Sequence, residues 1–231
     1  MKLQTLSRNT GIAAAALALS VSLAACGSED EPTTSTDETS EAPAPEPTEE
    51  ETTEEAPEPT STEPFGPGCK AIPTSGEGSF DAMVQDPVGT AAGTNPVLTT
   101  LTAAVGAIEG LGDTLNSAPA LTVFAPIDDP AFAAIPPKML TALVEGGMKD
   151  GMESDLFKIL AHHVVGERVE GDAIGGEYDT LNGDTITVSG DPEAGLTVTG
   201  GEVEANVLCG GIQTANATVY VIDAVMTDGD I

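Results

Sequence analysis

Residues 185–188 read TITV and residues 196–199 read LTVT, and these two stretches decide the fold class. Apolar and polar residues alternate in both, which is typical of β-strands that bury one face. Asn182-Gly183 precedes the first stretch and Gly200-Gly201 follows the second; both pairs tolerate positive φ and favour tight hairpin turns. Residues 219–222, VYVI, are apolar throughout and predict a buried strand near the C-terminus.

Helices are predicted upstream of these strands. Between residues 95 and 110, Pro96 suits a first helical turn and the apolar residues recur near helical spacing. A second helix is predicted from residue 137 to 144 and should be ended by Gly146-Gly147, while a third begins after the N-cap Ser154. Helices followed by β-hairpins indicate an α+β domain.

The N-terminus has the features of a secretory signal peptide over residues 1–25: a basic start, an apolar run at 11–19 and small residues before a cysteine. The apolar run is shorter than the roughly 20 residues of a transmembrane helix. Residues 23–26, LAAC, resemble the lipobox of bacterial lipoproteins, which implies cleavage before Cys26 and attachment of diacylglycerol to it. We therefore expect a secreted protein held by lipid at the outer face of the cell membrane and exposed to the cell wall or surface. A soluble secreted protein with an incidental cysteine is the alternative.

A tether is predicted over residues 26–65. Residues 27–64 contain only Gly, Ser, Thr, Asp, Glu, Ala and Pro, with 14 carboxylates and no basic residue. Low hydrophobicity and high net charge predict disorder, and an extended chain of this length would span about 118 Å. We interpret it as a spacer between membrane and domain, and its Thr, Ser and Pro content allows O-glycosylation.

The charge balance excludes one class of partner. The chain has 38 acidic and 7 basic residues, and removal of Lys2 and Arg8 with the signal peptide would change its net charge from −31 to −33. Nucleic acid is not expected as a partner, because affinity for it rests mainly on Lys and Arg at phosphates. An anionic lipid surface is repelled for the same reason, so acyl chains must provide the membrane attachment.

The folded domain is predicted over residues 66–231, a length that suits one domain. Its two cysteines, Cys69 and Cys209, lie far apart in the sequence. In an oxidising extracellular compartment they suggest one disulfide. A metal site is the poorer interpretation, because neither cysteine has further ligands beside it.

Three stretches resemble the fasciclin (FAS1) domain family. Residues 121–126, LTVFAP, resemble its first signature box, residues 162–165, HHVV, its central segment, and residues 217–225, ATVYVIDAV, its second box. The resemblance implies a single FAS1 domain, a wedge of two β-sheets with several α-helices. The signature positions it places on this chain are Thr122, Phe124, Ala125, Pro126, Asp128, Asp129, Phe132, His163, Tyr220, Ile222 and Asp223.

Shorter motifs are similar to those of secreted and lipid-anchored mycobacterial antigens within this family, which implies an actinobacterial source and a Cys69–Cys209 disulfide. These motifs are GPGC at 66–69, DPV at 86–88, DTLNS at 113–117 and CGG at 209–211. The chain departs from the family at residues 127–131, which are one residue longer than usual, so that Asp128 or Asp129 is expected to provide the cap. It also has His162 where the family usually has Tyr.

No catalytic residue, metal or cofactor is predicted. His162 and His163 are the only histidines, and adjacent side chains diverge, which suits packing better than chelation. We expect His163 to be buried and His162 to point toward solvent. The sequence lacks a nucleophile elbow, a phosphate-binding loop and a calcium-loop pattern.

The predicted function is adhesion or protein–protein interaction at the cell envelope or with extracellular matrix, through an unidentified protein partner. Five apolar residues of the second predicted helix and its C-terminal side are candidates for a contact face or for the core: Met139, Leu140, Leu143, Met148 and Met152. The first alternative is an envelope lipoprotein that carries a metabolite or lipid, which an internal cavity would favour. The second is an envelope hydrolase that uses paired carboxylates.

Overall fold

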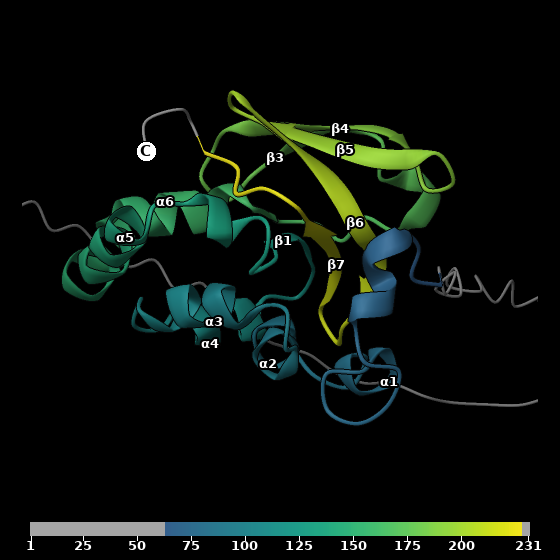
Figure 1. Cartoon of the computed structure of the whole chain (residues 1–231), viewed down its shortest axis with the longest axis horizontal. Coiled ribbons are helices and arrows are strands. Elements are labelled where there is room, and N and C mark those ends of the chain that lie inside the picture. Colours follow the sequence, from purple (N-terminus) through teal and green to yellow (C-terminus); the bar gives the residue numbers. More distant parts are fainter. Residues whose placement is uncertain (1–62, 228–231) are drawn as a thin grey trace, which may run out of the picture. The chain divides into compact units, whose positions relative to one another are not determined.

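The computed structural model describes residues 63–227. The predicted signal peptide, Cys26 and nearly all of the predicted tether lie outside the described residues. Within them the chain forms an α+β domain, as expected, with helices in its first half and most strands in its second (Figure 1).

The α-helices are short, apart from α5. They are α1 (Phe80–Met83), α2 (Val88–Thr94), α3 (Thr99–Gly106), α4 (Leu111–Ser117), α5 (Pro137–Asp150) and α6 (Asp155–His162). The strands are β1 (Leu121–Pro126), β2 (Val164–Val165), β3 (Gly176–Asp179), β4 (Thr185–Asp191), β5 (Gly195–Gly200), β6 (Val203–Gln213) and β7 (Ala217–Ile222). Short 3-10 turns are η1 (Pro67–Ala71), η2 (Phe132–Ala134), η3 (Gly151–Glu153) and η4 (Gly171–Ala173).

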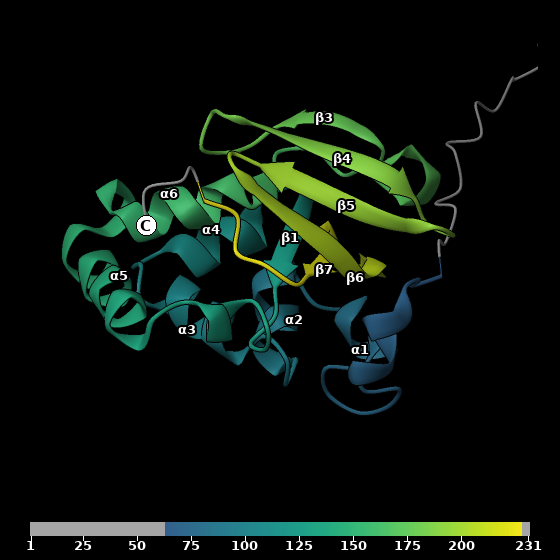
Figure 2. The same cartoon turned by 45° about the horizontal axis from the view of Figure 1, so that its top comes forward.

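The seven strands form one strongly curved sheet in the order β2-β1-β7-β6-β5-β4-β3 (Figure 2). β1 and β7 are parallel, and the other neighbours are antiparallel. The first part of β6 pairs with β5 and its second part with β7, so the two expected sheets are continuous through this strand. A bridge between Val165 of β2 and Thr180, just after β3, brings the two edges together and nearly closes the sheet into a barrel.

Two hydrophobic cores lie on the two faces of the central strands. One packs the helices against β1, β6 and β7, and the other fills the interior of the curved sheet. Residues of β7 alternate between them: Val219 and Val221 contact the helical core, whereas Tyr220 and Ile222 belong to the interior core. A strand buried on both faces must be apolar throughout, which explains the VYVI run.

The predicted hairpins are confirmed, because turns join β3 to β4 at Gly183 and β5 to β6 at Gly201, both with positive φ. The third predicted helix is also confirmed as α6, where the Ser154 hydroxyl accepts a hydrogen bond from the Phe157 amide. The first of the predicted helices, between residues 95 and 110, exists as α3 but begins only at Thr99.

The predicted end of the second helix is wrong, because α5 continues through Gly146-Gly147 to Asp150. Gly147 is buried, and a Cβ atom there would lie 2.7 Å from a methyl carbon of Leu156. The glycine therefore allows α5 to pack closely on α6 rather than ending the helix. Within residues 63–227, no helix is both long and apolar enough to cross a membrane.

Candidate functional site

The two signature boxes lie side by side as the parallel pair β1 and β7. Their register places Phe124 opposite Tyr220 and Pro126 opposite Ile222. Phe124 and Tyr220 are fully buried, and their rings stack with centroids 5.6 Å apart. Each apolar signature side chain therefore contributes to the core rather than to an exposed surface.

Polar atoms of the same pair hold the segment that follows β2. The buried Thr122 hydroxyl donates to the Glu167 carbonyl at 2.7 Å and accepts from the Val169 amide at 2.8 Å. The Tyr220 hydroxyl donates to the Val169 carbonyl at 3.1 Å, and burial raises the pKa of Tyr220. Thr122 and Tyr220 thus fix residues 167–169. The sequence of residues 167–169 does not indicate this contact.

Asp128 caps a helix other than the one that follows it. Its carboxylate accepts hydrogen bonds from the amides of Thr99 and Thr100 at the start of α3, at 3.2 and 2.7 Å, and from the Thr99 hydroxyl at 2.6 Å. Burial alone would raise the pKa of Asp128, but these hydrogen bonds outweigh it and lower the pKa. Asp129 is exposed.

Asp223 holds the sheet at the end of β7. Its carboxylate accepts from the backbone and side-chain amides of Asn206 in β6 at 2.7 and 2.8 Å. A register shift follows one residue later, between Val207 and Cys209, so this pairing lies where the ladder of β6 and β7 becomes irregular. Asp128, Asp129 and Asp223 each lie outside any group of three or more potential metal ligands in the described chain.

His163 is buried and has both ring nitrogens paired. Nδ1 lies 2.7 Å from the Ile159 carbonyl, so it must carry the proton, and Nε2 accepts from the Met226 amide at 2.9 Å. Burial lowers the pKa of His163 to about 4, so the ring is neutral at physiological pH. It links the end of α6 to the C-terminal segment.

The expectation that His162 points toward solvent is wrong, because its side chain is 2% exposed. Nδ1 lies 2.7 Å from a carboxylate oxygen of Asp184, although the ring is poorly aligned for a hydrogen bond. Gly200 lies against the ring, where any larger residue would collide with it. Burial would raise the pKa of Asp184, but hydrogen bonds from Thr180 and Asn182 and the contact with His162 lower it.

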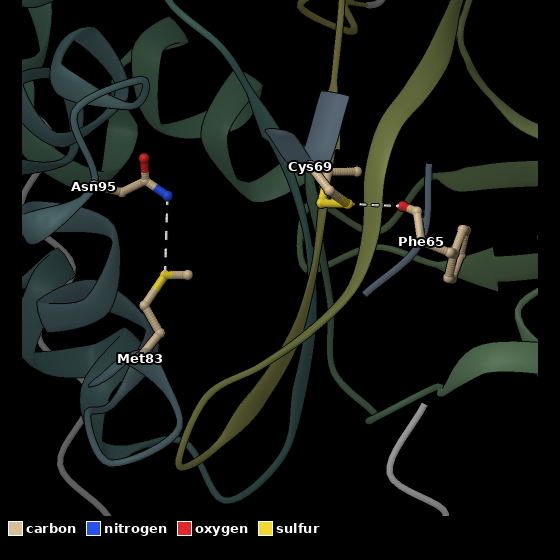
Figure 3. Close-up of a disulfide and its surroundings, with 5 residues drawn as sticks. Phe65, Cys69, Met83 and Asn95 are labelled. Carbon is tan, nitrogen blue, oxygen red and sulfur yellow. Dashed lines mark hydrogen bonds between the residues drawn. A yellow bond between two sulfur atoms is a disulfide. The ribbon is translucent and has the colours of Figure 1, made fainter. Parts of the chain in front are cut away.

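Cys69 and Cys209 form a disulfide that joins the N-terminal turn η1 to β6 (Figure 3). The same region is held by paired backbone bonds between Phe65 and Gly210 at 3.0 and 2.8 Å. A sulfur atom of Cys69 also lies 3.0 Å from the Phe65 carbonyl, a close contact without a donated proton because the oxidised sulfur carries none. The disulfide expected from the sequence is therefore confirmed, and it fixes the start of the domain to the sheet.

The proposed contact face on α5 is divided between core and surface. Leu140 and Leu143 pack against the helical core, and Met139 is half-buried. Met148 and Met152 are exposed by 65% and 48%, which is unusual for large apolar side chains in this domain. Only the C-terminal end of the predicted face is therefore available to a partner.

A cavity of about 150 Å³ lies between two groups of helices. Residues of α2, α3 and α4 line one side of it, residues of α6 and β2 line the other, and residues of β1 line its base. Exposed side chains of Met152 and Leu181 are part of its lining. The sequence does not indicate this cavity, since its lining comes from seven separate segments and has no motif.

The described residues offer no evident catalytic arrangement. Both histidines are held in structural contacts, and within residues 63–227 both cysteines form the disulfide. The shallow surface hollow beside β3 contains the carboxylates of Glu167, Glu177 and Asp179, and all three of these acids are exposed.

A buried parallel pair of signature strands in a nearly closed sheet, with helices on its outer face, defines a fasciclin fold. The family model for the fasciclin domain matches residues 96–228, more than half of the chain. The chain belongs to the fasciclin family.

Mycobacterial immunogenic and cell-surface proteins are among its relatives. Immunogenic protein MPT70 of Mycobacterium tuberculosis is 42% identical over 168 residues, which cover 70% of this chain and 80% of that protein. Cell surface glycolipoprotein MPT83 of the same organism is 38% identical over 199 residues, which cover 82% of this chain and 83% of that protein. A solved FAS1 domain pair from the insect cell adhesion molecule fasciclin I matches at 22% identity and a TM-score of 0.40 over 55% of this chain and 43% of that one, and adds nothing to the assignment.

Proposed function

We propose that this protein is a lipid-anchored fasciclin-domain protein of the cell surface that mediates adhesion or protein–protein contact. The observation that carries the proposal is the extent of the likeness to cell surface glycolipoprotein MPT83. The match covers 82% of this chain, which is about 189 of its 231 residues, whereas residues 63–231 number only 169. The similarity therefore extends at least about 20 residues into the predicted tether that precedes the domain.

The disulfide also supports a place outside the cytoplasm, because such bonds persist in oxidising compartments. Lipid attachment is tested by detergent partitioning and intact mass. The wild-type chain should enter the detergent phase with the mass of acyl chains, and Cys26→Ser should remain in the aqueous phase. Equal partitioning of the two would contradict the anchor.

Protein contact is proposed to involve the exposed end of α5. Met148 is 65% exposed and does not line the cavity, so it can be changed without altering either core. Val84, which is 44% exposed, provides a matched control on another part of the surface.

The test is a pull-down from envelope and matrix proteins with the Cys26→Ser chain, followed by an affinity measurement on the captured partner. Met148→Ser should weaken that affinity at least about tenfold, since a well-buried apolar anchor contributes about 1.4 kcal/mol or more. Val84→Ser should leave it unchanged. Failure to capture any saturable partner would count against adhesion.

A further inference from the structure

The cavity between the helices is lined almost entirely by apolar side chains. Three polar side chains contribute to its lining, and each has its hydrogen bonds elsewhere in the protein. Thr102 donates to backbone carbonyls in α2 and at the start of α3, Thr114 donates to Gly110, and both nitrogens of His163 are paired. The other lining residues are aliphatic or aromatic, apart from one glycine: Val88, Gly89, Ala92, Leu101, Val105, Leu111, Leu115, Val123, Phe124, Met152, Phe157, Leu160, Ala161, Val164 and Leu181.

The size of the cavity exceeds what ordinary packing leaves. Protein interiors contain few voids larger than a water molecule, and a dry apolar void forfeits contacts on every side. An engineered cavity of similar volume in another protein, lined by Leu, Ile and Phe, stays dry and binds benzene. A volume of about 150 Å³ therefore accommodates a ligand segment of about six carbons.

The mouth of the cavity is apolar as well. The structure exposes four large apolar side chains among residues 63–227, and two of them, Met152 and Leu181, line this cavity. A ligand longer than the cavity would continue across these side chains, and the flexible Met152 can adjust to its shape. Leaving apolar side chains exposed to water is unfavourable, so their position at the opening supports a ligand that covers them.

The helices around the cavity form two groups by backbone packing, and side chains of both groups meet in one hydrophobic core. Helices α2, α3 and α4 pack on one another and α5 packs on α6, while backbone contacts between the two groups are few. Figure 1 shows the ribbons of α3 and α4 on one side and those of α5 and α6 on the other.

The charges of the protein limit which headgroups the ligand can carry. Lys70, Lys138, Lys149, Lys158 and Arg168 are the basic residues of the described chain, and none of them lines the cavity. An anionic headgroup would find no cationic partner in the lining and would face a chain of net charge −31. A headgroup with no net charge remains compatible with the rim.

We propose that this cavity binds a single hydrocarbon chain of an amphiphile whose headgroup has no net charge, with about six carbons inside and the headgroup beyond Met152 and Leu181. Binding of such a ligand would be an activity separate from adhesion, and it does not depend on the proposed adhesion role. The same protein can use its exposed α5 end for a partner and this cavity for an alkyl chain.

The first experiment titrates the full-length Cys26→Ser chain with 1-butanol, 1-hexanol and 1-octanol, observed by NMR at the methyl groups of Leu101, Leu160 and Val164. Each added methylene should tighten binding about fourfold until the cavity is full near hexanol. Affinity should then rise much less for octanol. Absence of saturable shifts at these methyl groups, or an even rise with chain length, would overturn the proposal.

Cavity-filling variants make the test specific. Ala161→Leu on α6 places new carbons in the cavity and should weaken 1-hexanol binding at least tenfold, as should Ala92→Leu on the opposite wall. Ala103→Leu on the exposed face of α3 is the matched control and should bind within twofold of the parent. Two filling variants guard against misfolding of one, which circular dichroism would reveal. Unchanged affinity in a folded filling variant would overturn the proposal.

A second experiment distinguishes a membrane lipid from a free amphiphile as the source of the hydrocarbon chain. Vesicles of zwitterionic phosphatidylcholine are sedimented with the Cys26→Ser chain, which lacks the lipid anchor. Sedimentation that Ala161→Leu abolishes would identify a membrane lipid as the source, whereas hexanol binding without sedimentation would identify a free amphiphile. Absence of both would refute the proposal while leaving the pull-down result for adhesion unaffected.

Discussion

Acid should destabilise this domain through His163 before its carboxylates contribute. The ring is buried and neutral, and its nitrogens bind the Ile159 carbonyl and the Met226 amide. The pKa of His163 is lowered to about 4, chiefly by burial and also by the neighbouring His162, against the opposing effects of the Ile159 carbonyl and Asp184. Protonation would place a charge in the core and remove the acceptor for Met226.

The direction and size of this loss of stability follow from the pKa values of His163 in the unfolded and the folded chain. The ordinary histidine value of 6.5 applies to the unfolded chain, so as the pH falls the unfolded chain binds the proton first. Stability from this group is therefore complete above pH 6.5 and is lost as the pH falls toward 4. The loss is about 2 kcal/mol at pH 5 and about 3 kcal/mol at pH 4.

Carboxylates act in a lower range. The pKa values of Asp128 and Asp184 are lowered from 3.8, so the stability that they contribute is lost only as the pH falls below that value. The window between pH 6.5 and 4 therefore separates the effect of His163 from that of these two aspartates.

The assay is urea unfolding at pH 7, 6, 5 and 4.5. His163→Gln should be less stable than the wild type at pH 7, yet its free energy of unfolding should change little across this window. His162→Gln is the matched control and should keep most of the slope. A flat wild-type profile, or a slope that disappears in His162→Gln and persists in His163→Gln, would refute the reasoning.

Three further predictions concern stability. Asp128→Ala should lower the free energy of unfolding by about 1–2 kcal/mol, because α3 loses its cap, whereas the exposed Asp129→Ala should change it by less than about 0.5 kcal/mol; equal effects in chemical denaturation would contradict the assignment. Replacing Cys69 and Cys209 together by Ala opens a crosslink with a sequence separation of 140 and should cost up to about 5 kcal/mol, and a loss below about 1 kcal/mol in urea would show that the crosslink contributes little. Tyr220→Phe should cost about 1 kcal/mol by leaving the Val169 carbonyl without its donor, and an unchanged melting temperature would argue against that bond.

Local patterns in the sequence were sufficient for much of the fold. Alternation predicted β4 and β5, and the hydroxyl of Ser154 marked the start of α6, because both signals depend on neighbours in the chain. The end of α5 was not predictable in this way. Gly147 breaks an isolated helix, but here Leu156 packs against its bare backbone, so a tertiary contact outweighs local propensity.

The candidate sites show the same division. The signature residues were identified from the sequence, yet their role depends on pairing between strands almost 100 residues apart. The sequence placed His162 beside His163 but could not show which side chain was buried; Asp184, Gly200 and Met226 enclose them from other segments.

By itself, the sequence determined the α+β class, the family resemblance, the two cysteines available for a disulfide and the acidic character of the chain. These properties follow from composition and from patterns between near neighbours. Only the tertiary structure decided that the two boxes form one parallel pair, that Asp128 caps α3 and that a cavity lies behind Met152 and Leu181. Each of those features joins segments that are distant in the chain, and their approach depends on the packing of the whole domain.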